Sequence, residues 1–204
     1  MEAVGLRERK KLERRGAIVA ATLDLCTENG FDATTVDAIA ERADVSRRTF
    51  FRFFPAKENA VIALDDDLFA TAIDLFDRST RAAPAIELVG EALAEATTHY
   101  DDDWHRRFVL AARLHDSVPH VEAVGLELCA RTAGQFRAHL RPRLEHTPDH
   151  VLDLALEAAV SGWRLARAEW LLAAAPTPAG LRELVRRNVQ ALAEATALVV
   201  PATS

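Results

Sequence analysis

Residues 44–58 read DVSRRTFFRFFPAKE, from Asp44 to Glu58. The stretch holds four of the nine phenylalanines in the chain, interleaved with three arginines. At about 100° per residue, a helix over residues 47–54 places all four phenylalanines on one arc, with Phe51 at its edge. The opposite arc contains Arg48, Thr49 and Arg52. This pattern predicts a short helix whose aromatic face anchors it to its neighbours while the arginines and the threonine are held outward.

A second amphipathic helix precedes this one. Its apolar stripe at i, i+3, i+4 and i+7 consists of Val36, Ile39, Ala40 and Ala43. Thr34, with Asp37 three residues later, resembles a capping box at the start of this helix. A tight break follows at Asp44–Val45, and Ser46 is a good N-cap for the next helix. Two short helices joined by a tight turn predict a helix-turn-helix.

In a helix-turn-helix, the second helix enters the major groove of DNA and its N-terminal residues read base edges. Arginine binds guanine O6 and N7 in a bidentate manner, and the threonine methyl group packs on the methyl group of thymine. Helix N-termini suit phosphates, and Thr35 and Lys57 lie at such starts. Arg47 falls over the apolar arc, but in the first turn it can swing outward. We expect the basic segment that precedes the helix-turn-helix to contact an adjacent groove of the DNA. Its cations are Arg7, Arg9, Lys10, Lys11, Arg14 and Arg15.

The segment TTVDAIAERADVSRRTFFRFFPAKE, residues 34–58, closely resembles the DNA-binding signature of tetracycline-repressor (TetR) type transcriptional regulators. The resemblance covers about residues 10–60. It implies an all-α fold with an N-terminal three-helix DNA-binding domain that contains the helix-turn-helix. A six-helix domain for ligand binding and dimerisation would follow. We therefore expect a DNA-binding domain over residues 1–56 and a ligand-binding and dimerisation domain over residues 57–204.

The resemblance also implies which residues touch DNA. The contact positions of the family match Thr35, Arg47, Arg48, Thr49, Phe51, Phe53 and Lys57. To these we add Ser46 at the helix start and Arg52 on the polar arc. Two residues depart from the family pattern. Phe51 stands where the family often has tyrosine, so a hydroxyl contact to phosphate is missing. Asp44 stands where it usually has glycine, although Asp tolerates a left-handed conformation better than most residues.

The charge distribution suits a DNA-binding head on an acidic body. The net charge is −6, yet residues 1–57 hold eleven Lys/Arg against nine Asp/Glu, whereas the remainder holds fourteen against twenty-two. No apolar run approaches the roughly 18–20 residues that span a bilayer. Residues 17–23 lack the cleavage pattern of a signal peptide, because Asp24 and Glu28 follow at once. We expect a cytoplasmic protein without a membrane partner or a cofactor, in which Cys26 and Cys129 are buried hydrophobes.

Helix punctuation recurs along the chain and strand signals are absent, so the sequence predicts an all-α protein. The first helix runs from about Arg7 and ends at Asn29–Gly30, a natural C-terminal stop. Proline residues stand at the junctions of the later helices, where they are tolerated at a first turn or force a stop. Those helices are predicted at about 57–80, 84–100, 104–116, 120–143, 149–175 and 178–198.

The last two predicted helices carry apolar or small residues on more than one face. In the first of them, one stripe consists of Leu152, Ala155, Ala159, Trp163, Ala166 and Trp170. A second stripe consists of Leu154, Ala158, Ser161, Leu165 and Leu172. A helix that is apolar on two sides must bury both, one on its own domain and the other on a twin subunit. We expect a homodimer whose interface uses Ala155, Ala159, Trp163, Ala166, Leu184, Val185, Val189 and Leu192; a core buried within a monomer is the alternative.

Aromatic and polar residues of the middle helices are candidates for a small-molecule site, since such sites are apolar cavities with a few polar groups. The candidates are Phe69, Phe76, Tyr100, Trp104, Phe108, Arg113, His115, Phe136 and Trp163. Ordinary core packing is the alternative for each of them. The residues favour a largely apolar ligand, with Arg113 or His115 meeting an acidic head. Some relatives with similar RRTFFR recognition helices respond to fatty acyl compounds.

An enzyme is the alternative function. His115–Asp116 is an HD pair of the kind found in some all-α metal-dependent phosphohydrolases, but that chemistry needs further His and Asp ligands around one ion. The nearby acidic run at residues 101–103 is explained by a helix start. No HExxH, P-loop or GxSxG motif occurs. We therefore expect a regulator, not an enzyme: a homodimeric repressor that a small, largely apolar ligand releases from double-stranded operator DNA.

Overall fold

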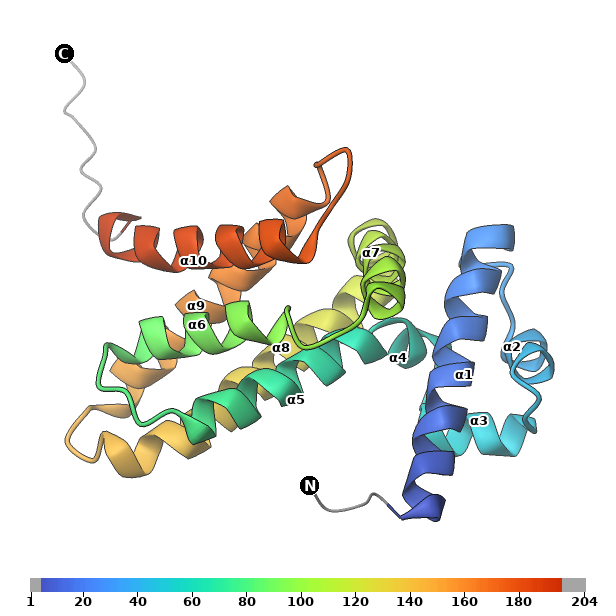
Figure 1. Ribbon diagram of the computed structural model, residues 1–204, viewed down its shortest axis with the longest axis horizontal. Helices are drawn as coiled ribbons and strands as arrows, with labels where there is room; N and C mark the ends of the chain where they lie inside the picture. Colours follow the sequence, from blue (N-terminus) through green and yellow to red (C-terminus); the bar gives the residue numbers. More distant parts are fainter. Residues whose placement is uncertain (1–4, 196–204) are drawn as a thin grey trace. The chain divides into compact units, whose positions relative to one another are not determined.

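The computed structural model describes residues 5–195, and within them every regular element is helical (Figure 1). The described residues form ten α-helices and one 3-10 helix. Their bounds are α1 Leu6–Asn29, α2 Val36–Arg42, α3 Arg47–Phe53, α4 Lys57–Val61, α5 Ala63–Arg78, α6 Ala85–Ala96, α7 Asp102–Ser117, α8 Pro119–Leu140, η1 Arg141–Arg143, α9 Asp149–Trp170 and α10 Pro178–Ala195. The prediction of an all-α chain is confirmed.

The chain forms two compact units. The first contains the chain up to Asp65 together with Arg106–Leu126. The second contains Asp66–His105 and the chain from Glu127 onward. The expected functional boundary between residues 56 and 57 remains a prediction.

In the first unit, α1 packs on α2 and α4, and α2 packs on α3. The core there is formed by apolar residues from each helix and from the turn after α1, and it includes Ile18, Phe31, Ile39, Phe50, Phe54 and Val61. Gly30 ends α1 with a φ of 83°, and its N–H donates to the carbonyl oxygen of Cys26 at 3.0 Å. Glycine reaches such positive φ values without steric cost, which explains the predicted stop.

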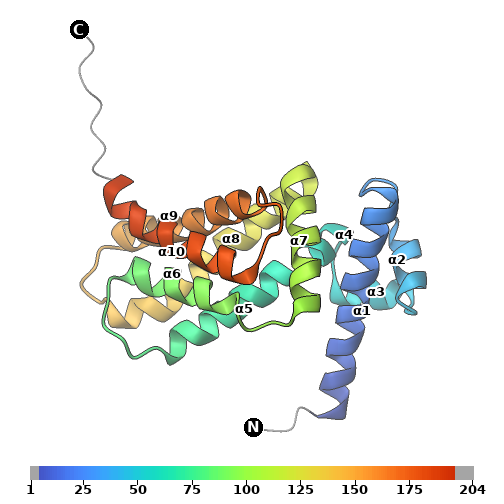
Figure 2. The ribbon, with the colours of Figure 1, turned by 45° about the horizontal axis from the view of Figure 1, so that its top comes forward.

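In the second unit, α6, α9 and α10 pack on one another (Figure 2). Helices α6 and α10 approach closely at Gly90 of α6, where an added Cβ would lie 2.5 Å from Cγ2 of Val189 in α10. The core includes Leu68, Phe69, Phe76, Leu93, Phe136, Trp163 and Val185.

Several predicted boundaries need correction. The helix expected at 57–80 is two helices, α4 and α5, separated at Ile62, although neither Gly nor Pro marks that position. A long-range contact at this break joins Arg15 Nη2 to the carbonyl oxygen of Ala63 at 3.2 Å. The helices expected to reach 100 and 175 end at Ala96 and Trp170. The predicted end of the last helix at 198 lies outside the described residues.

The capping residue of α2 was also misassigned. Thr35, not Thr34, is the N-cap, and its hydroxyl oxygen accepts a hydrogen bond from the Ala38 N–H at 3.2 Å. Thr34 is buried, and its hydroxyl donates to the carbonyl oxygen of Gly30 at 2.8 Å. Adjacent threonines look alike in sequence, and the path of the turn after α1 decides which of them reaches the helix start.

Gly90→Ala is predicted to lower the free energy of unfolding by about 1–3 kcal/mol, because the new methyl group overlaps the branched side chain of Val189. Gly134→Ala is the matched control, since a Cβ at Gly134 meets nothing within 4 Å. It should raise the free energy of unfolding by about 0.5–1 kcal/mol, because alanine is the better helix former. Urea denaturation of both variants measures this, and equal effects would contradict the close approach of α6 and α10.

Candidate functional site

The turn between α2 and α3 is closed by two backbone hydrogen bonds. The Val45 N–H donates to the Ala40 carbonyl oxygen at 2.9 Å, and the Asp44 N–H donates to the Glu41 carbonyl oxygen at 3.1 Å. This pairing is a Schellman motif, which needs a residue with positive φ just after the helix. Asp44 supplies it with a φ of 52°. The tight break expected at Asp44–Val45 is thus a defined turn that fixes where α3 begins.

Helix α3 starts at a second capped position. Ser46 is its N-cap, and the Ser46 hydroxyl oxygen accepts from the Thr49 N–H at 3.1 Å. The hydroxyl groups of Ser46 and Thr49 lie 2.9 Å apart and share a hydrogen bond. The two side chains therefore fix each other's position in the first turn of α3.

Two phenylalanines of α3 anchor it. Phe50 has no exposed surface and Phe54 is buried. Phe53 is half-buried, and Phe51 is 45% exposed at the edge of the aromatic arc, with its ring edge-on to Phe50 at 5.4 Å between centroids. Because the anchor side is fixed, the opposite side faces outward.

The outward side carries the predicted base-reading residues. Arg48 and Arg52 are exposed and Thr49 is half-buried. The guanidinium of Arg52 lies 5.4 Å from the centroid of the Phe53 ring. Arg48 makes no hydrogen bond or ion pair to any residue within 5–195. A rigid helix with an outward arginine and threonine near its start suits major-groove readout.

Lys57 is placed differently from a simple phosphate contact. Its ammonium group donates to the carbonyl oxygens of Phe31 at 2.7 Å and Thr34 at 2.9 Å. It also lies 4.1 Å from the centroid of the Phe31 ring, a cation–π distance. The lysine therefore ties the start of α4 to the turn before α2. An ammonium group has three N–H donors, so a third remains for a phosphate.

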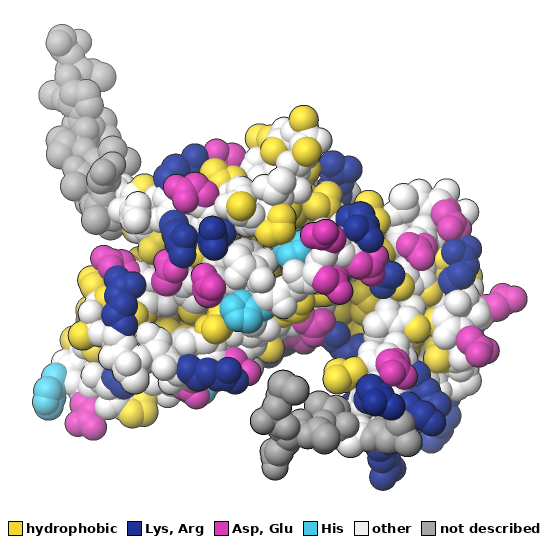
Figure 3. Space-filling view, in the orientation of Figure 1, with side chains coloured by type: hydrophobic (Ala, Val, Ile, Leu, Met, Phe, Trp, Pro, Cys, Tyr) yellow, Lys and Arg dark blue, Asp and Glu magenta, His cyan; other side chains and the backbone are white. Residues whose placement is uncertain are grey.

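A basic groove lies between the first turns of α1 and the end of α3. It has a volume of about 450 Å³ and is lined by Arg7, Glu8, Lys10, Lys11, Arg14, Arg52 and Phe53. Figure 3 shows Lys and Arg side chains gathered around this end of α1. Glu8 is paired with Lys11 at 3.0 Å, so the groove retains a strong positive excess. Part of the basic segment that precedes the helix-turn-helix thus shares a surface with α3.

Six of the predicted ligand-site residues belong to the second unit. Phe69 contacts Trp163 and Phe76 contacts Phe136, each pair edge-on at 5.7 and 5.5 Å between centroids. All four of these side chains are buried. Tyr100 stacks on Trp104 at 3.9 Å, and its hydroxyl donates to the Asp67 carbonyl oxygen at 2.8 Å. These residues form three aromatic pairs, which matches the core-packing alternative as well as a ligand site.

The other three predicted ligand-site residues, Phe108, Arg113 and His115, belong to the first unit. Phe108 and His115 are buried, whereas Arg113 is exposed. His115 Nδ1 lies 3.9 Å from Oδ2 of the buried Asp65. A Cβ on Gly125 would lie 2.2 Å from Cε1 of His115, so the glycine makes room for the imidazole.

The phosphohydrolase alternative finds no support in this arrangement. His115 points into the core while its neighbour Asp116 is exposed, so the HD pair does not converge. No group of three or more His, Cys, Asp or Glu side chains able to hold a metal ion occurs among residues 5–195. Asp101 accepts a hydrogen bond from the Trp104 N–H at 2.8 Å, which explains part of the acidic run as a helix start.

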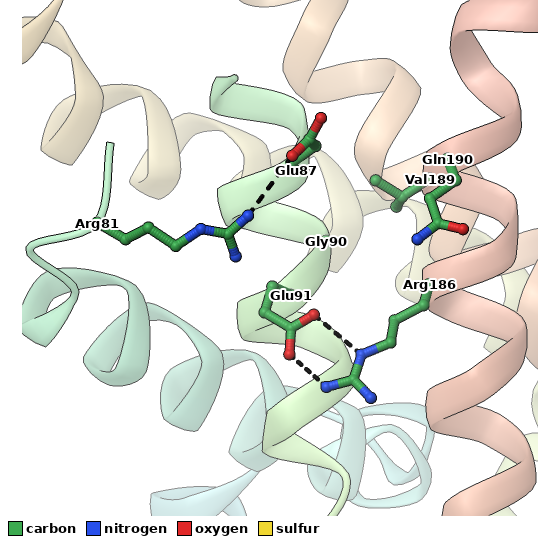
Figure 4. Close-up of a pocket in the computed structure, with 7 residues that line it drawn as sticks. All are labelled: Arg81, Glu87, Gly90, Glu91, Arg186, Val189 and Gln190. Carbon is green, nitrogen blue, oxygen red and sulfur yellow. Dashed lines mark hydrogen bonds and ion pairs between the residues drawn. The ribbon is translucent and has the colours of Figure 1, made fainter. Parts of the chain in front are cut away.

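Two small grooves lie beside α6. One, of about 170 Å³, is lined by Arg81, Glu87, Gly90, Glu91, Arg186, Val189 and Gln190 (Figure 4). Two ion pairs lie within it. Arg186 donates two hydrogen bonds to Glu91, one of them 2.9 Å from Nε to Oε2. Arg81 pairs with Glu87 at 3.6 Å. The hydrogen bonds from Arg186 lower the pKa of Glu91 below its usual range.

The second groove, of about 220 Å³, is lined by Leu75, Phe76, Ser79, Arg81, Leu88, Glu91, Ala92 and Glu95. Both volumes lie below the roughly 300–1,000 Å³ typical of small-molecule sites. The ion pairs brace α10 on α6, and neither groove has the form of a ligand cavity.

The predicted dimer residues lie mainly in the chain's own core. Five of the eight are buried: Ala159, Trp163, Ala166, Val185 and Val189. Ala155, Leu184 and Leu192 are half-buried. A buried side chain has little surface left for a second subunit. The second stripe of α9 is the one that stays exposed, with Leu154 at 68%, Leu165 at 66% and, just beyond the helix, Leu172 at 85%.

Helices α1 to α3 thus form a helix-turn-helix domain, and every regular element that follows within residues 5–195 is helical. Residues 18–64 match the model of the family described as "Bacterial regulatory proteins, tetR family". This segment thus resembles that family, as the recognition-helix sequence indicated.

Relatives and solved structures extend this finding. The chain is 38% identical over 74 residues to the regulator TcmR of Streptomyces glaucescens, covering 35% of this chain and 33% of that protein. It is 43% identical over 51 residues to the repressor KstR of Rhodococcus jostii, covering 25% of this chain and 24% of that protein. The matched region thus spans about a quarter to a third of the length of these relatives.

The similarity in fold covers more of the chain than the similarity in sequence. A TetR-family repressor of Thermus thermophilus, FadR, solved in complex with lauroyl-CoA, matches with a TM-score of 0.56 and 24% identity over 93% of this chain and 98% of that one. A TetR-family regulator of Syntrophomonas wolfei matches with a TM-score of 0.65 and 16% identity over 90% and 96%. At these identities the likeness establishes the shared fold: an N-terminal helix-turn-helix domain followed by a helical body.

Lys57→Met is predicted to lower the free energy of unfolding by about 1.5–3 kcal/mol, because two carbonyl oxygens lose a charged donor. Lys10→Met removes the same charge from an exposed position of α1 and should leave stability unchanged within about 0.5 kcal/mol. Urea denaturation of both variants measures the difference. Equal stability of the two would mean that the lysine does not tie α4 to the turn before α2.

Proposed function

We propose that this protein is a ligand-responsive, sequence-specific DNA-binding transcriptional regulator, and that it represses by occupying its operator. The observation that carries the proposal is the orientation of α3, with Phe50 and Phe54 buried and Arg48 and Thr49 turned outward behind a closed turn. The family match over residues 18–64 supports it. The proposed place of action is the cytoplasm.

The proposed DNA contacts divide into two kinds. Arg48 and Thr49 read base edges, since both lie on the outward arc near the start of α3. The remaining contacts position the protein on phosphates and sugars, which carry no direct sequence information. The full proposed set is Thr35, Ser46, Arg47, Arg48, Thr49, Phe51, Arg52, Phe53 and Lys57, joined by the cations of the basic groove.

We infer that the operator has two half-sites and that the regulator binds it as a homodimer. The second stripe, which consists of Leu154, Ala158, Ser161, Leu165 and Leu172, supports this inference because it is a mostly apolar and largely exposed face. An exposed apolar face of this extent marks an interaction site in soluble proteins. We therefore propose this exposed stripe as the dimer interface, in place of the buried residues that the sequence favoured.

The proposed effector is a small, largely apolar molecule that binds among the aromatic residues of the second unit. Binding there has to part the Phe69–Trp163 or Phe76–Phe136 contact, because these rings already touch. A ligand that favours the parted arrangement shifts the protein toward it by the difference in affinity for the two states. Helices α5, α7 and α8 each contribute residues to both compact units, so they offer a continuous covalent route for the shift.

A catalytic role is not part of the proposal. The His115 imidazole is buried and packs on α8 at Gly125, whereas the Asp116 side chain is exposed. Stoichiometric metal in the purified protein would reopen the phosphohydrolase alternative.

The proposal is tested by fluorescence anisotropy with the upstream intergenic DNA of the gene and a shuffled duplex at physiological salt. We expect a preference of about a thousandfold or more for the native DNA. Arg48→Ala should weaken binding to it by about 1–3 kcal/mol and relax the preference at one base pair. Arg78→Ala, an exposed arginine of α5, is the control and should change nothing. Equal losses on both duplexes would make Arg48 a phosphate contact.

The same anisotropy assay tests the proposed effector. Lauroyl-CoA, the compound present in the Thermus thermophilus FadR structure, is the first probe. Loss of operator binding on its addition would support an acyl-type effector, and a compound that saturates the protein without changing DNA affinity is not an effector.

The dimer is tested by light scattering after size exclusion. The wild-type chain, of 22.4 kDa, is expected to elute with the mass of two chains. Leu165→Glu should yield monomers, because it places a charge twice in a symmetric apolar interface. Leu126→Glu, a change of an exposed leucine on α8, should leave the dimer intact. A monomeric wild-type protein, or a dimeric Leu165→Glu variant, contradicts the proposed interface.

A further inference from the structure

Arg47 is the first residue of α3, yet its charged group lies against α2. Its Nη1 is 2.8 Å from Oδ1 and 2.7 Å from Oδ2 of Asp37, in the first turn of α2. Its guanidinium carbon also lies 5.5 Å from the centroid of the Phe51 ring. Phe51 in turn contacts the buried Phe50. Arg47 is thus held between a carboxylate on one helix and an aromatic ring on its own helix.

The other arginines of α3 are not held in this way. Arg52 contacts the ring of Phe53, and no residue within 5–195 pairs its charge or that of Arg48 with a carboxylate. Asp37 therefore neutralises one selected cation of the recognition helix. The distance along the chain is ten residues, and the contact spans the turn between the helices.

The Arg47–Asp37 pair does little for the stability of the fold. The two side chains are 60% and 68% exposed, and ion pairs so exposed to solvent contribute little to stability. A carboxylate on the same helical pair as the proposed DNA-reading face also opposes binding to a polyanion. The consequences of the pair are therefore expected in DNA binding.

We propose that Asp37 limits the affinity of this protein for DNA, which rests on the proposed function. By binding Arg47, it competes with the DNA phosphates for this cation, whatever the sequence of the DNA. Phosphate contacts contribute to the affinity for operator and random DNA alike, whereas base readout by Arg48 does not depend on them. Specificity is a difference of affinities, so a contribution common to every sequence cancels from it and Asp37 lowers both affinities.

The test compares Asp37→Asn with wild type on the upstream duplex and the shuffled duplex over a range of salt concentrations. Asparagine keeps the shape of the side chain and removes the charge that holds Arg47. Binding to the shuffled duplex should become about three- to tenfold tighter, with a log–log salt slope steeper by about 0.9, as one more phosphate contact requires. Binding to the upstream duplex should tighten by a similar factor, so the preference for it should stay unchanged.

Two variants make the result decisive. Glu41→Gln removes the same charge from an exposed position of α2 and should leave the salt slope at its wild-type value. In the Asp37→Asn/Arg47→Gln double variant the gain on shuffled DNA should vanish. An unchanged slope in Asp37→Asn, an equal gain in Glu41→Gln, or a gain that persists in the double variant would overturn the proposal.

The shuffled-duplex slopes are measurable whether or not the upstream DNA is preferred. A wild-type protein with no preference overturns the proposed function, while the slopes still show whether Asp37 withholds a cation. A protein that binds neither duplex overturns both.

Discussion

The helix-turn-helix depends on the burial of two phenylalanine rings. A helix of seven residues is not stable in water on its own, because nucleation costs more than so few hydrogen bonds return. Phe50 and Phe54 supply the missing free energy by packing into the core that Ile18, Ile39 and Phe31 complete. With those two rings inside, helical geometry leaves Arg48 and Thr49 no other direction than outward. The orientation of the proposed reading face is therefore a consequence of core packing.

Around this anchor, charged side chains are used as structural parts as well as for a proposed DNA surface. Lys57 binds two backbone carbonyl oxygens, and Arg42 forms a two-fold ion pair with Glu28 that lowers the pKa of that carboxyl group. Asp37 forms an ion pair with Arg47. The formal excess of positive charge in this part of the chain thus overstates the cations available to phosphates, and the basic groove at the start of α1 holds most of the rest.

The second unit is built on a different principle. Small residues such as Gly90 let α6, α9 and α10 approach closely, and ion pairs between Arg186 and Glu91 and between Arg187 and Glu169 fix α10 on its neighbours. Aromatic rings fill the interior in touching pairs. If the proposed effector binds there, part of its affinity has to be spent on separating rings that already satisfy one another. Such a cost is what couples ligand binding to a change of conformation.

The sequence by itself determined the helical class, the helix-turn-helix, the stop at Gly30, the left-handed position at Asp44 and which side of α3 is aromatic. Each of these depends on residues that lie close together along the chain, where periodicity and capping preferences act. Tertiary structure decided the rest. Thr35 and not Thr34 caps α2 because of the path of the preceding turn, and the break at Ile62 has no local signal. Asp37 meets Arg47 across a turn, and Lys57 meets Phe31 from 26 residues away. The two apolar stripes of α9 look equivalent in sequence, and only the packing of α6 and α10 on that helix buries one and leaves the other exposed, because burial is a property of neighbours that lie far apart along the chain.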